Sequence, residues 1–238
     1  MSDLDLHPSS KSVSRQHLRE DQVVTAYARA WVYFDEHRVL VYGMLAVLVL
    51  VIIAGAGYTV YLGKQQDKAE QLLAGPVQAY EANQFQVALE GQNARPGLLA
   101  IADEYGNTES GNLARFYAAN ALFHTGQYDK ALTYFEEFEK DGDLLGASAI
   151  AGEAAVYEEK GDFSRAAELY RKAADFYENK LTTPQYLLNA ARAYESAGEY
   201  QKALDLYSEI KEEYTDFASA GNIDVFIARA KAEQSNPS

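Results

Sequence analysis

Cysteine is absent from the 238-residue chain, and proline, methionine and tryptophan are scarce. Without cysteine the protein has no disulfide, no thiolate metal site and no cysteine nucleophile. The scarcity of proline, beside abundant alanine, leucine, glutamate and tyrosine, favours helices. Positive charge is also in short supply, since 21 Lys and Arg face 35 Asp and Glu and leave a net charge of −14. An acidic surface repels nucleic-acid phosphates, so nucleic-acid binding is not expected.

Motifs for catalysis and cofactor binding are missing as well. The sequence has no glycine-rich phosphate loop, and its paired acids have the pattern of solvated helix faces. The four histidines do not have the spacing of metal ligands; they are His7, His17, His37 and His124. We therefore expect a protein that is not an enzyme, with no catalytic residue, cofactor, metal or small-molecule substrate.

One stretch, from Val39 to Gly63, contains no charged residue. As a helix it would be ~37 Å long, which is enough to cross a hydrocarbon core of about 30 Å. A buried core helix of a soluble protein is one alternative, but such helices are usually shorter. A cleavable signal peptide is another, but the leader contains Asp35 and Glu36 and is far longer than the basic leader of a signal peptide. The stretch predicts a retained transmembrane helix over residues 39–63.

The leader has two parts. Residues 1–18 are polar, without apolar periodicity, and are predicted to be disordered. Over residues 19–38, apolar residues recur at steps of three and four, which predicts an amphipathic helix. Two interpretations stay open, namely a helix lying on the inner leaflet or a helix that docks a membrane partner through Trp31. Basic residues in this short leader favour a cytoplasmic N-terminus, with the long domain on the other side.

Three segments beyond the anchor align, beginning at Gly126, Gly161 and Gly198. In each, an aromatic residue follows the glycine by two positions, an alanine by five and a second aromatic residue by nine. The alanines are Ala131, Ala166 and Ala203, and the second aromatics are Phe135, Tyr170 and Tyr207. Twelve residues before each of these alanines stands another alanine, at Ala119, Ala154 and Ala191. The alanines recur after 35 and 37 residues, close to the tetratricopeptide period of about 34. We expect glycine in the turn of each helical hairpin, and alanine where its two helices approach closely.

These patterns predict an all-α fold, in which one transmembrane helix precedes a superhelix of tetratricopeptide-repeat (TPR) hairpins. Residues 64–106 are expected to form a helical linker and a degenerate first repeat, in which Phe85 and Ala88 keep the aromatic-to-alanine step and Pro96 opens a short helix. Three TPR hairpins are expected over 107–216, and a C-terminal capping helix and tail over 217–238.

The first helices of such hairpins line a concave groove, which is the usual binding surface. The residues expected to face it are Phe116, Asn120, Phe123, Gln185, Leu188, Asn189 and Arg192. One interpretation is a peptide groove with aromatic anchors, amides for the peptide backbone and an arginine for a carboxylate. The other is that these residues serve groove packing or contact the terminal helix.

The combination of EDQVVTAYARAWVYFDEHR, the anchor, and IADEYGNTESGNLA leading into the repeats resembles a bacterial family. Its members are single-pass inner-membrane TPR proteins described as ancillary subunits of the SecYEG translocon. The resemblance implies a cytoplasmic N-terminus, a periplasmic repeat domain, and an adaptor function towards the translocon, periplasmic chaperones and exported proteins. The alternative is a cell-envelope assembly factor that coordinates cell-wall or outer-membrane machinery. The chain departs from the family in its longer, Ser-rich leader.

Overall fold

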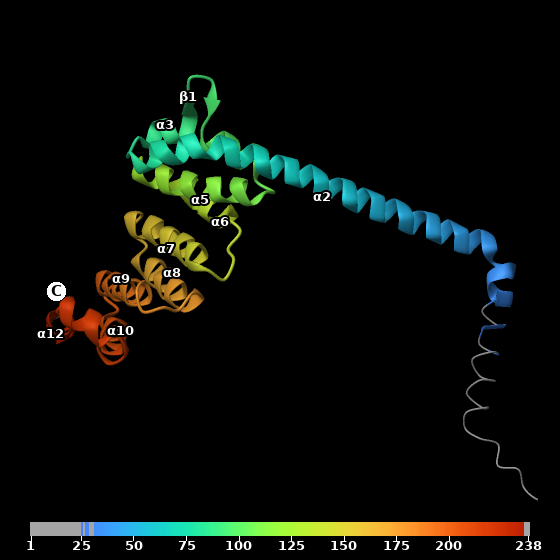
Figure 1. The fold of residues 1–238 in the computed structure, drawn as a ribbon. Coiled ribbons are helices and arrows are strands. Elements are labelled where there is room, and N and C mark those ends of the chain that lie inside the picture. Colours follow the sequence, from blue (N-terminus) through green and yellow to red (C-terminus); the bar gives the residue numbers. More distant parts are fainter. Residues whose placement is uncertain (1–24, 26, 29–30, 236–238) are drawn as a thin grey trace, which may run out of the picture. The chain divides into compact units, whose positions relative to one another are not determined.

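A computed structural model describes residues 25, 27–28 and 31–235 of the chain (Figure 1). The chain divides into two compact units between Val60 and Tyr61. The expected disordered leader and nine of the twenty residues of the expected amphipathic helix over 19–38 lie outside the described residues. Within the described part of the first unit, residues 31–36 are helical. The Trp31 side chain is 61% exposed, and its ring centroid lies 6.1 Å from that of Phe34.

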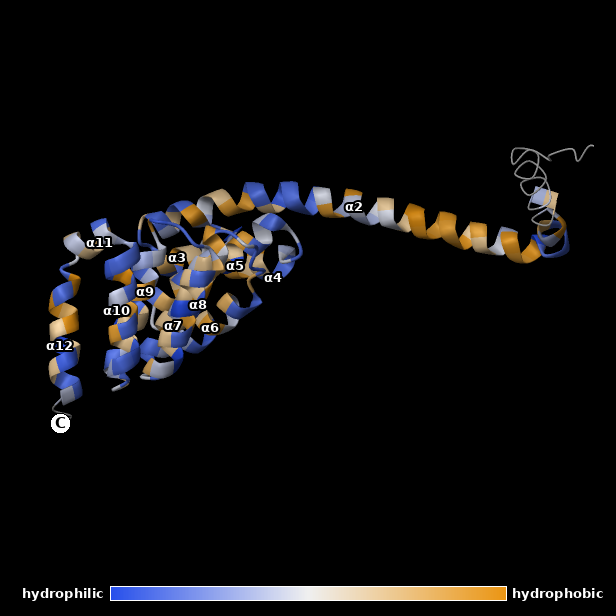
Figure 2. Cartoon of the chain, turned by 90° about the horizontal axis from the view of Figure 1, so that it is seen from below, coloured by the Kyte–Doolittle hydropathy of each residue, from blue (hydrophilic) through white to orange (hydrophobic). Residues whose placement is uncertain are grey.

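Helix α2 (Arg38–Glu81) is a single helix of 44 residues. It is long and apolar enough to cross a membrane. No residue between Val39 and Gly63 is buried against another part of the described chain. In Figure 2 the apolar residues gather in the first part of α2, whereas the helices of the second unit mix polar and apolar positions. The helix does not end with the apolar run but continues into the second unit.

Four turns of one geometry organise the second unit. Asn83, Gly126, Gly161 and Gly198 all have a left-handed backbone, with φ of 58°, 74°, 80° and 76°. In every case the next residue donates its backbone N–H to the carbonyl five positions before it, at 2.8 to 2.9 Å. This bond is the mark of the Schellman helix end, in which glycine or asparagine takes the left-handed position. The described part of the second unit therefore contains four helical hairpins, and Asn83 closes the first helix of the degenerate one.

The first hairpin pairs the end of α2 with α3 (Phe85–Glu90) and α4 (Leu98–Tyr105). The other three pair α5 (Glu109–His124) with α6 (Tyr128–Glu137), α7 (Leu144–Glu159) with α8 (Phe163–Phe176), and α9 (Thr183–Ser196) with α10 (Tyr200–Glu213). The expected small positions of both helices are fully buried: Ala119, Ala131, Ala154, Ala166, Ala191 and Ala203. The second aromatics are buried too, so the sequence pattern identified the core correctly.

A small β-hairpin interrupts the second helix of the first repeat. Strand β1 (Gly91–Gln92) pairs antiparallel with β2 (Arg95–Pro96) through the two-residue turn Asn93-Ala94. Both turn residues have positive φ, 53° and 62°, as a type I′ turn requires. The short helix expected after Pro96 is present as α4, which ends at Tyr105, but it begins at Leu98 and not at Pro96, because Pro96 ends β2.

The β-hairpin is an insertion into one helix. A Cβ on Gly97 would lie 2.2 Å from the Leu89 carbonyl oxygen and 2.4 Å from the Gly91 nitrogen, so the chain returns to the point that it left. Without residues 91–96, the buried positions of α3 and α4 would follow one another at steps of three and four. These positions are Ala88, Leu89, Leu98, Ile101, Ala102 and Tyr105. Helix α4 thus resumes the apolar face that α3 began.

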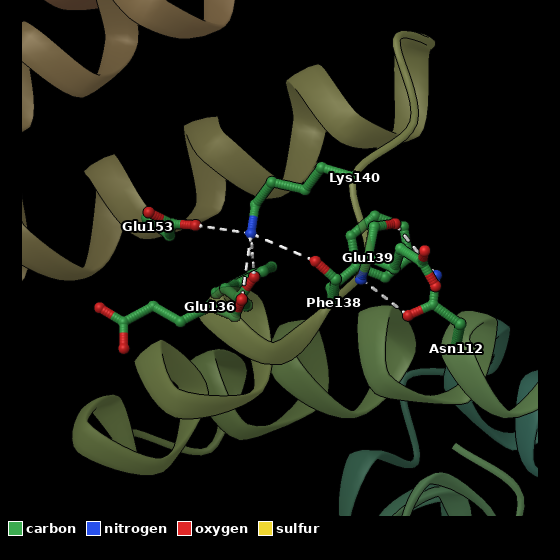
Figure 3. A network of polar contacts seen from close by, with 7 residues as sticks. Asn112, Glu136, Phe138, Glu139, Lys140 and Glu153 are labelled. Atoms are coloured by element: carbon green, nitrogen blue, oxygen red, sulfur yellow. Dashed lines mark hydrogen bonds and ion pairs between the residues drawn. The ribbon is translucent and has the colours of Figure 1, made fainter. Parts of the chain in front are cut away.

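A partly buried lysine fixes the link between the second and third hairpins (Figure 3). Lys140 Nζ donates to the carbonyl oxygen of Phe135 at 2.6 Å and pairs with Glu153 Oε1 at 3.0 Å. The side chains of Lys140 and Glu153 are only 18% and 12% exposed. Beside them, Asn112 exchanges two hydrogen bonds with the backbone of Glu139, at 2.8 and 3.0 Å. The link is therefore tied to α5, α6 and α7 together.

The last two helices, α11 (Thr215–Ala220) and α12 (Ile223–Ser235), close the C-terminal end of the array. Ile223 and Ala230 are fully buried, and Phe226 stacks on Tyr207 with ring centroids 5.7 Å apart. Arg229 forms an ion pair with Glu195. Helix α12 thus covers the apolar face that the last hairpin would otherwise expose to water.

Candidate functional site

The seven expected groove residues lie on two helices, α5 and α9, which are the first helices of the second and fourth hairpins. Thr108 starts α5, because its hydroxyl oxygen accepts the Gly111 N–H at 3.1 Å. Helix α7, from the hairpin between them, starts in the same way with Asp143 accepting from Gly146 at 2.8 Å. The three helices end at matching points, two residues before a left-handed glycine, so equivalent residues are found by aligning these glycines.

The α5 residues are half-buried. Phe116 packs against Phe138 and Phe135, with ring centroids 5.5 and 6.5 Å apart. Phe123 packs against Tyr128 at 5.5 Å. Asn120 donates its side-chain amide to the Phe116 carbonyl at 2.8 Å. The two phenylalanines therefore contribute to packing as well as to the surface, while Asn120 keeps an acceptor oxygen for a ligand.

The α9 residues differ more among themselves. Leu188 is 9% exposed and belongs to the hydrophobic core, so it offers little surface to a ligand. Gln185 donates to Asn189 at 3.0 Å, one turn further along the helix. Arg192 is exposed. Among these residues, Arg192 is the one that places a charge at the surface.

Sequence reasoning missed the residues of α7 that fill the gap between α5 and α9. Aligned on the turn glycines, Phe116 and Asn120 correspond to Ala151 and Ala155 of α7, and Tyr117 corresponds to Gly152. A Cβ on Gly152 would lie 2.3 Å from the Phe135 ring, so glycine is required for this close approach. The repeat alignment could have identified these α7 residues, because it assigns an α7 residue to every position chosen on α5.

In the third and fourth hairpins, a tyrosine of the second helix is hydrogen-bonded to a glutamate of the first helix. The Tyr170 hydroxyl donates to Glu158 at 2.9 Å, and one repeat later the Tyr207 hydroxyl donates to Glu195 at 2.7 Å. Burial, together with the adjacent carboxylate, raises the pKa of both tyrosines above the ordinary value. The positive charge of Arg192 opposes this rise in both pKa values, so Arg192 lies near the two tyrosine–glutamate pairs.

The exposed side chains of this surface are suited to non-covalent contacts. The residues that the structure describes include no group of three or more His, Asp or Glu side chains placed to hold a metal ion. In the same residues, each buried side-chain nitrogen and oxygen has a hydrogen-bond partner. What is exposed is an arginine, amides and half-buried aromatic rings, which suit peptide contacts. The fold and this surface define a helical-hairpin repeat protein.

Comparison with known proteins identifies the repeat family to which the chain belongs. The sequence profile of the tetratricopeptide repeat matches residues 83–144, 117–180 and 151–216. These ranges together cover more than half of the chain, which therefore belongs to the tetratricopeptide repeat family. Such repeats are interaction scaffolds rather than catalysts. No curated protein and no solved structure matches the chain.

Proposed function

We propose that the chain is a membrane-anchored adaptor of the bacterial inner membrane, with residues 1–38 in the cytoplasm and the TPR array in the periplasm. Its partners are the SecYEG translocon, periplasmic chaperones and exported proteins. The observation that carries the proposal is α2, in which an exposed apolar stretch continues as the first helix of the repeat array. The resemblance of the pre-anchor segment to translocon-associated TPR proteins supports the choice of partners.

The translocon assignment is tested by crosslinking. A photoreactive amino acid is placed at Trp31 of the full chain in bacterial membranes, and a second is placed at exposed Tyr177 as a matched control. Adducts to translocon subunits from position 31 and none from position 177 are expected. Adducts to cell-wall or outer-membrane assembly proteins instead would favour the envelope-assembly alternative and overturn the translocon assignment.

Orientation is tested by protease access. On spheroplasts, protease should digest the residues beyond Lys64 and leave the leader intact, and on inverted vesicles the pattern should reverse. Protection of the repeats in spheroplasts would overturn the proposed topology.

The groove residues are proposed to hold the protein partner, with Arg192 binding a carboxylate. Full-length protein is purified in mild detergent, and the proteins that co-purify are quantified by mass spectrometry. Arg192→Glu should lower partner recovery about tenfold, because it turns a charge-assisted hydrogen bond into a repulsion. Lys172→Glu, at an exposed position of α8, makes the same charge change on another helix and should have no effect. Equal recovery from the two variants would refute the groove assignment.

A further inference from the structure

A cavity of about 620 Å³ lies between the end of α2 and the β-hairpin. Pro76, Ala79, Val87 and Pro96 give it an apolar lining, and the remaining lining is rich in side-chain amides. This volume falls in the usual range for sites that hold a small ligand or a few peptide residues. The cavity belongs entirely to the second unit of the chain.

The cavity occupies the face on which another hairpin would stack. Aligned on the four turns, Gly75, Gln78 and Ala79 of α2 correspond to Ala118, Ala121 and Leu122 of α5. Those α5 residues are at most 1% exposed, because the first hairpin packs against them. The first hairpin has no predecessor, so the corresponding α2 residues are open and the β-hairpin lies beside them. This face differs from the groove, since the groove residues of α5 align with Leu73, Val77 and Tyr80.

The charge of the cavity is opposite to that of the domain around it. Residues 64–238 carry 29 acidic residues against 16 basic ones. None of the acidic residues lines the cavity, and Arg95 on β2 is its one charged lining residue. Within the described chain, the Arg95 guanidinium has neither a hydrogen-bond nor an ion-pair partner. An arginine in the lining without a partner in the described chain has its donors available to a carboxylate.

We propose that this cavity is a second peptide-binding site, which holds a short peptide through a carboxylate on Arg95. The amides of Gln78, Gln84 and Gln92 supply donors and acceptors for the peptide backbone. The apolar lining residues Pro76, Ala79, Val87 and Pro96 take one small or medium apolar side chain. The carboxylate is either a free C-terminus or an acidic side chain. This site depends neither on the groove nor on the translocon assignment.

The test uses the purified full-length chain in mild detergent and three sets of synthetic pentapeptides. One set ends in a free carboxylate, the second has the same sequences with C-terminal amides, and the third has C-terminal amides and one internal glutamate. Affinities of the tightest peptides are measured by fluorescence anisotropy. We expect binding in the first or the third set, and binding ~10- to 100-fold weaker in the second.

Four variants locate the binding. Arg95→Gln should weaken it ~10- to 100-fold, and Ala82→Glu, which adds a negative charge to the lining, should do the same. Lys172→Gln removes one exposed positive charge elsewhere and should leave the affinity unchanged, and Arg192→Gln reports whether a peptide binds in the groove instead. Arg95 and Ala82 are exposed, so both variants should keep the thermal midpoint of the wild type.

The peptide set that binds identifies the source of the carboxylate. Binding of the first set indicates a protein C-terminus, and binding of the third indicates an acidic side chain. Equal affinity for acid and amide peptides, absence of binding up to 1 mM, or unchanged affinity in Arg95→Gln would overturn the proposal. Dependence on Arg192 instead of Arg95 would also overturn it, while leaving the proposed groove function intact.

Discussion

At the scale of single residues, asparagine replaces glycine where the repeat is degenerate. Asn83 takes the left-handed conformation that Gly126, Gly161 and Gly198 take in the other turns. Asparagine is the residue after glycine that tolerates this conformation best, because its short polar side chain bonds locally. The motif search relied on glycine and on an aromatic residue nine positions later, and the first repeat has neither. The first turn is therefore regular in structure although its sequence does not match the motif.

The two buried tyrosines, each hydrogen-bonded to a glutamate, predict an alkaline limit to stability. Because the pKa values of Tyr170 and Tyr207 are raised on folding, their contribution is complete below the unfolded pKa near 10 and is lost as pH rises towards the folded values. Each shifted tyrosine should lower the free energy of unfolding by about 1.4 kcal/mol per pH unit in that window. Urea unfolding, followed by circular dichroism between pH 7 and 11, should show this fall.

Variants separate these tyrosines from the others. Tyr170→Phe/Tyr207→Phe should be less stable than wild type at pH 7, because hydrogen bonds to carboxylates are lost. The difference should shrink above pH 10, where the wild type alone pays for keeping both phenols protonated. Tyr177→Phe, at a 40% exposed position, should follow the wild-type curve. Stability curves that stay parallel up to pH 11 would contradict this prediction.

At the scale of elements, the link between α6 and α7 depends on one cation. Lys140→Met should lower the free energy of unfolding by about 1–3 kcal/mol, because it leaves the Glu153 carboxylate and the backbone carbonyl of Phe135 without their donor. Urea unfolding measures the loss. The control Lys172→Met should change the free energy by less than about 0.5 kcal/mol, as expected for an exposed site.

A double variant tests the cause. Lys140→Met/Glu153→Leu removes the partly buried carboxylate as well as its partner, so it should recover part of the loss. If the loss in free energy of unfolding of the double variant equalled the sum of the losses of the two single variants, the ion pair would not be the reason for the effect.

Helices were predictable from the sequence and the β-hairpin was not. Periodic alanines and aromatics in α5 to α10 point to buried faces at helical spacing, and the structure buries them. The β-hairpin is carried by only six residues, with the turn sequence Asn93-Ala94 in place of the usual Asn-Gly. Proline at the start of a helix is a strong signal, and at Pro96 it was misleading because the chain was still in a strand. The cavity beside the hairpin could not be predicted without the insertion.

The candidate groove was only partly predictable for a related reason. Position in the repeat identifies which helix supplies a residue, and it placed all seven residues on α5 and α9 as expected. It does not give burial, which is set by neighbours on other helices. Leu188 is buried in the core, and Phe116 packs against Phe135 and Phe138, whereas Arg192 is exposed.

At the scale of the whole molecule, an apolar span and an acidic repeat domain belong to one chain. The span exposes large side chains such as Leu50 and Ile53, at 64% and 62%, that water would not stabilise. We expect the full chain to sediment with bacterial membranes and to resist carbonate extraction, but to dissolve in detergent. A chain beginning at Lys64 should remain in the supernatant. Recovery of the full chain in the soluble fraction would contradict a transmembrane anchor.

The narrow gap between Gly91 and Gly97 has a consequence for how the first repeat tolerates change. Because the two ends of the inserted strands meet, their length and sequence are uncoupled from the helix that they interrupt. Related chains are then free to enlarge, shorten or discard this projection without rebuilding the core. The shape of that end of the array can therefore change while the stacked hairpins stay the same.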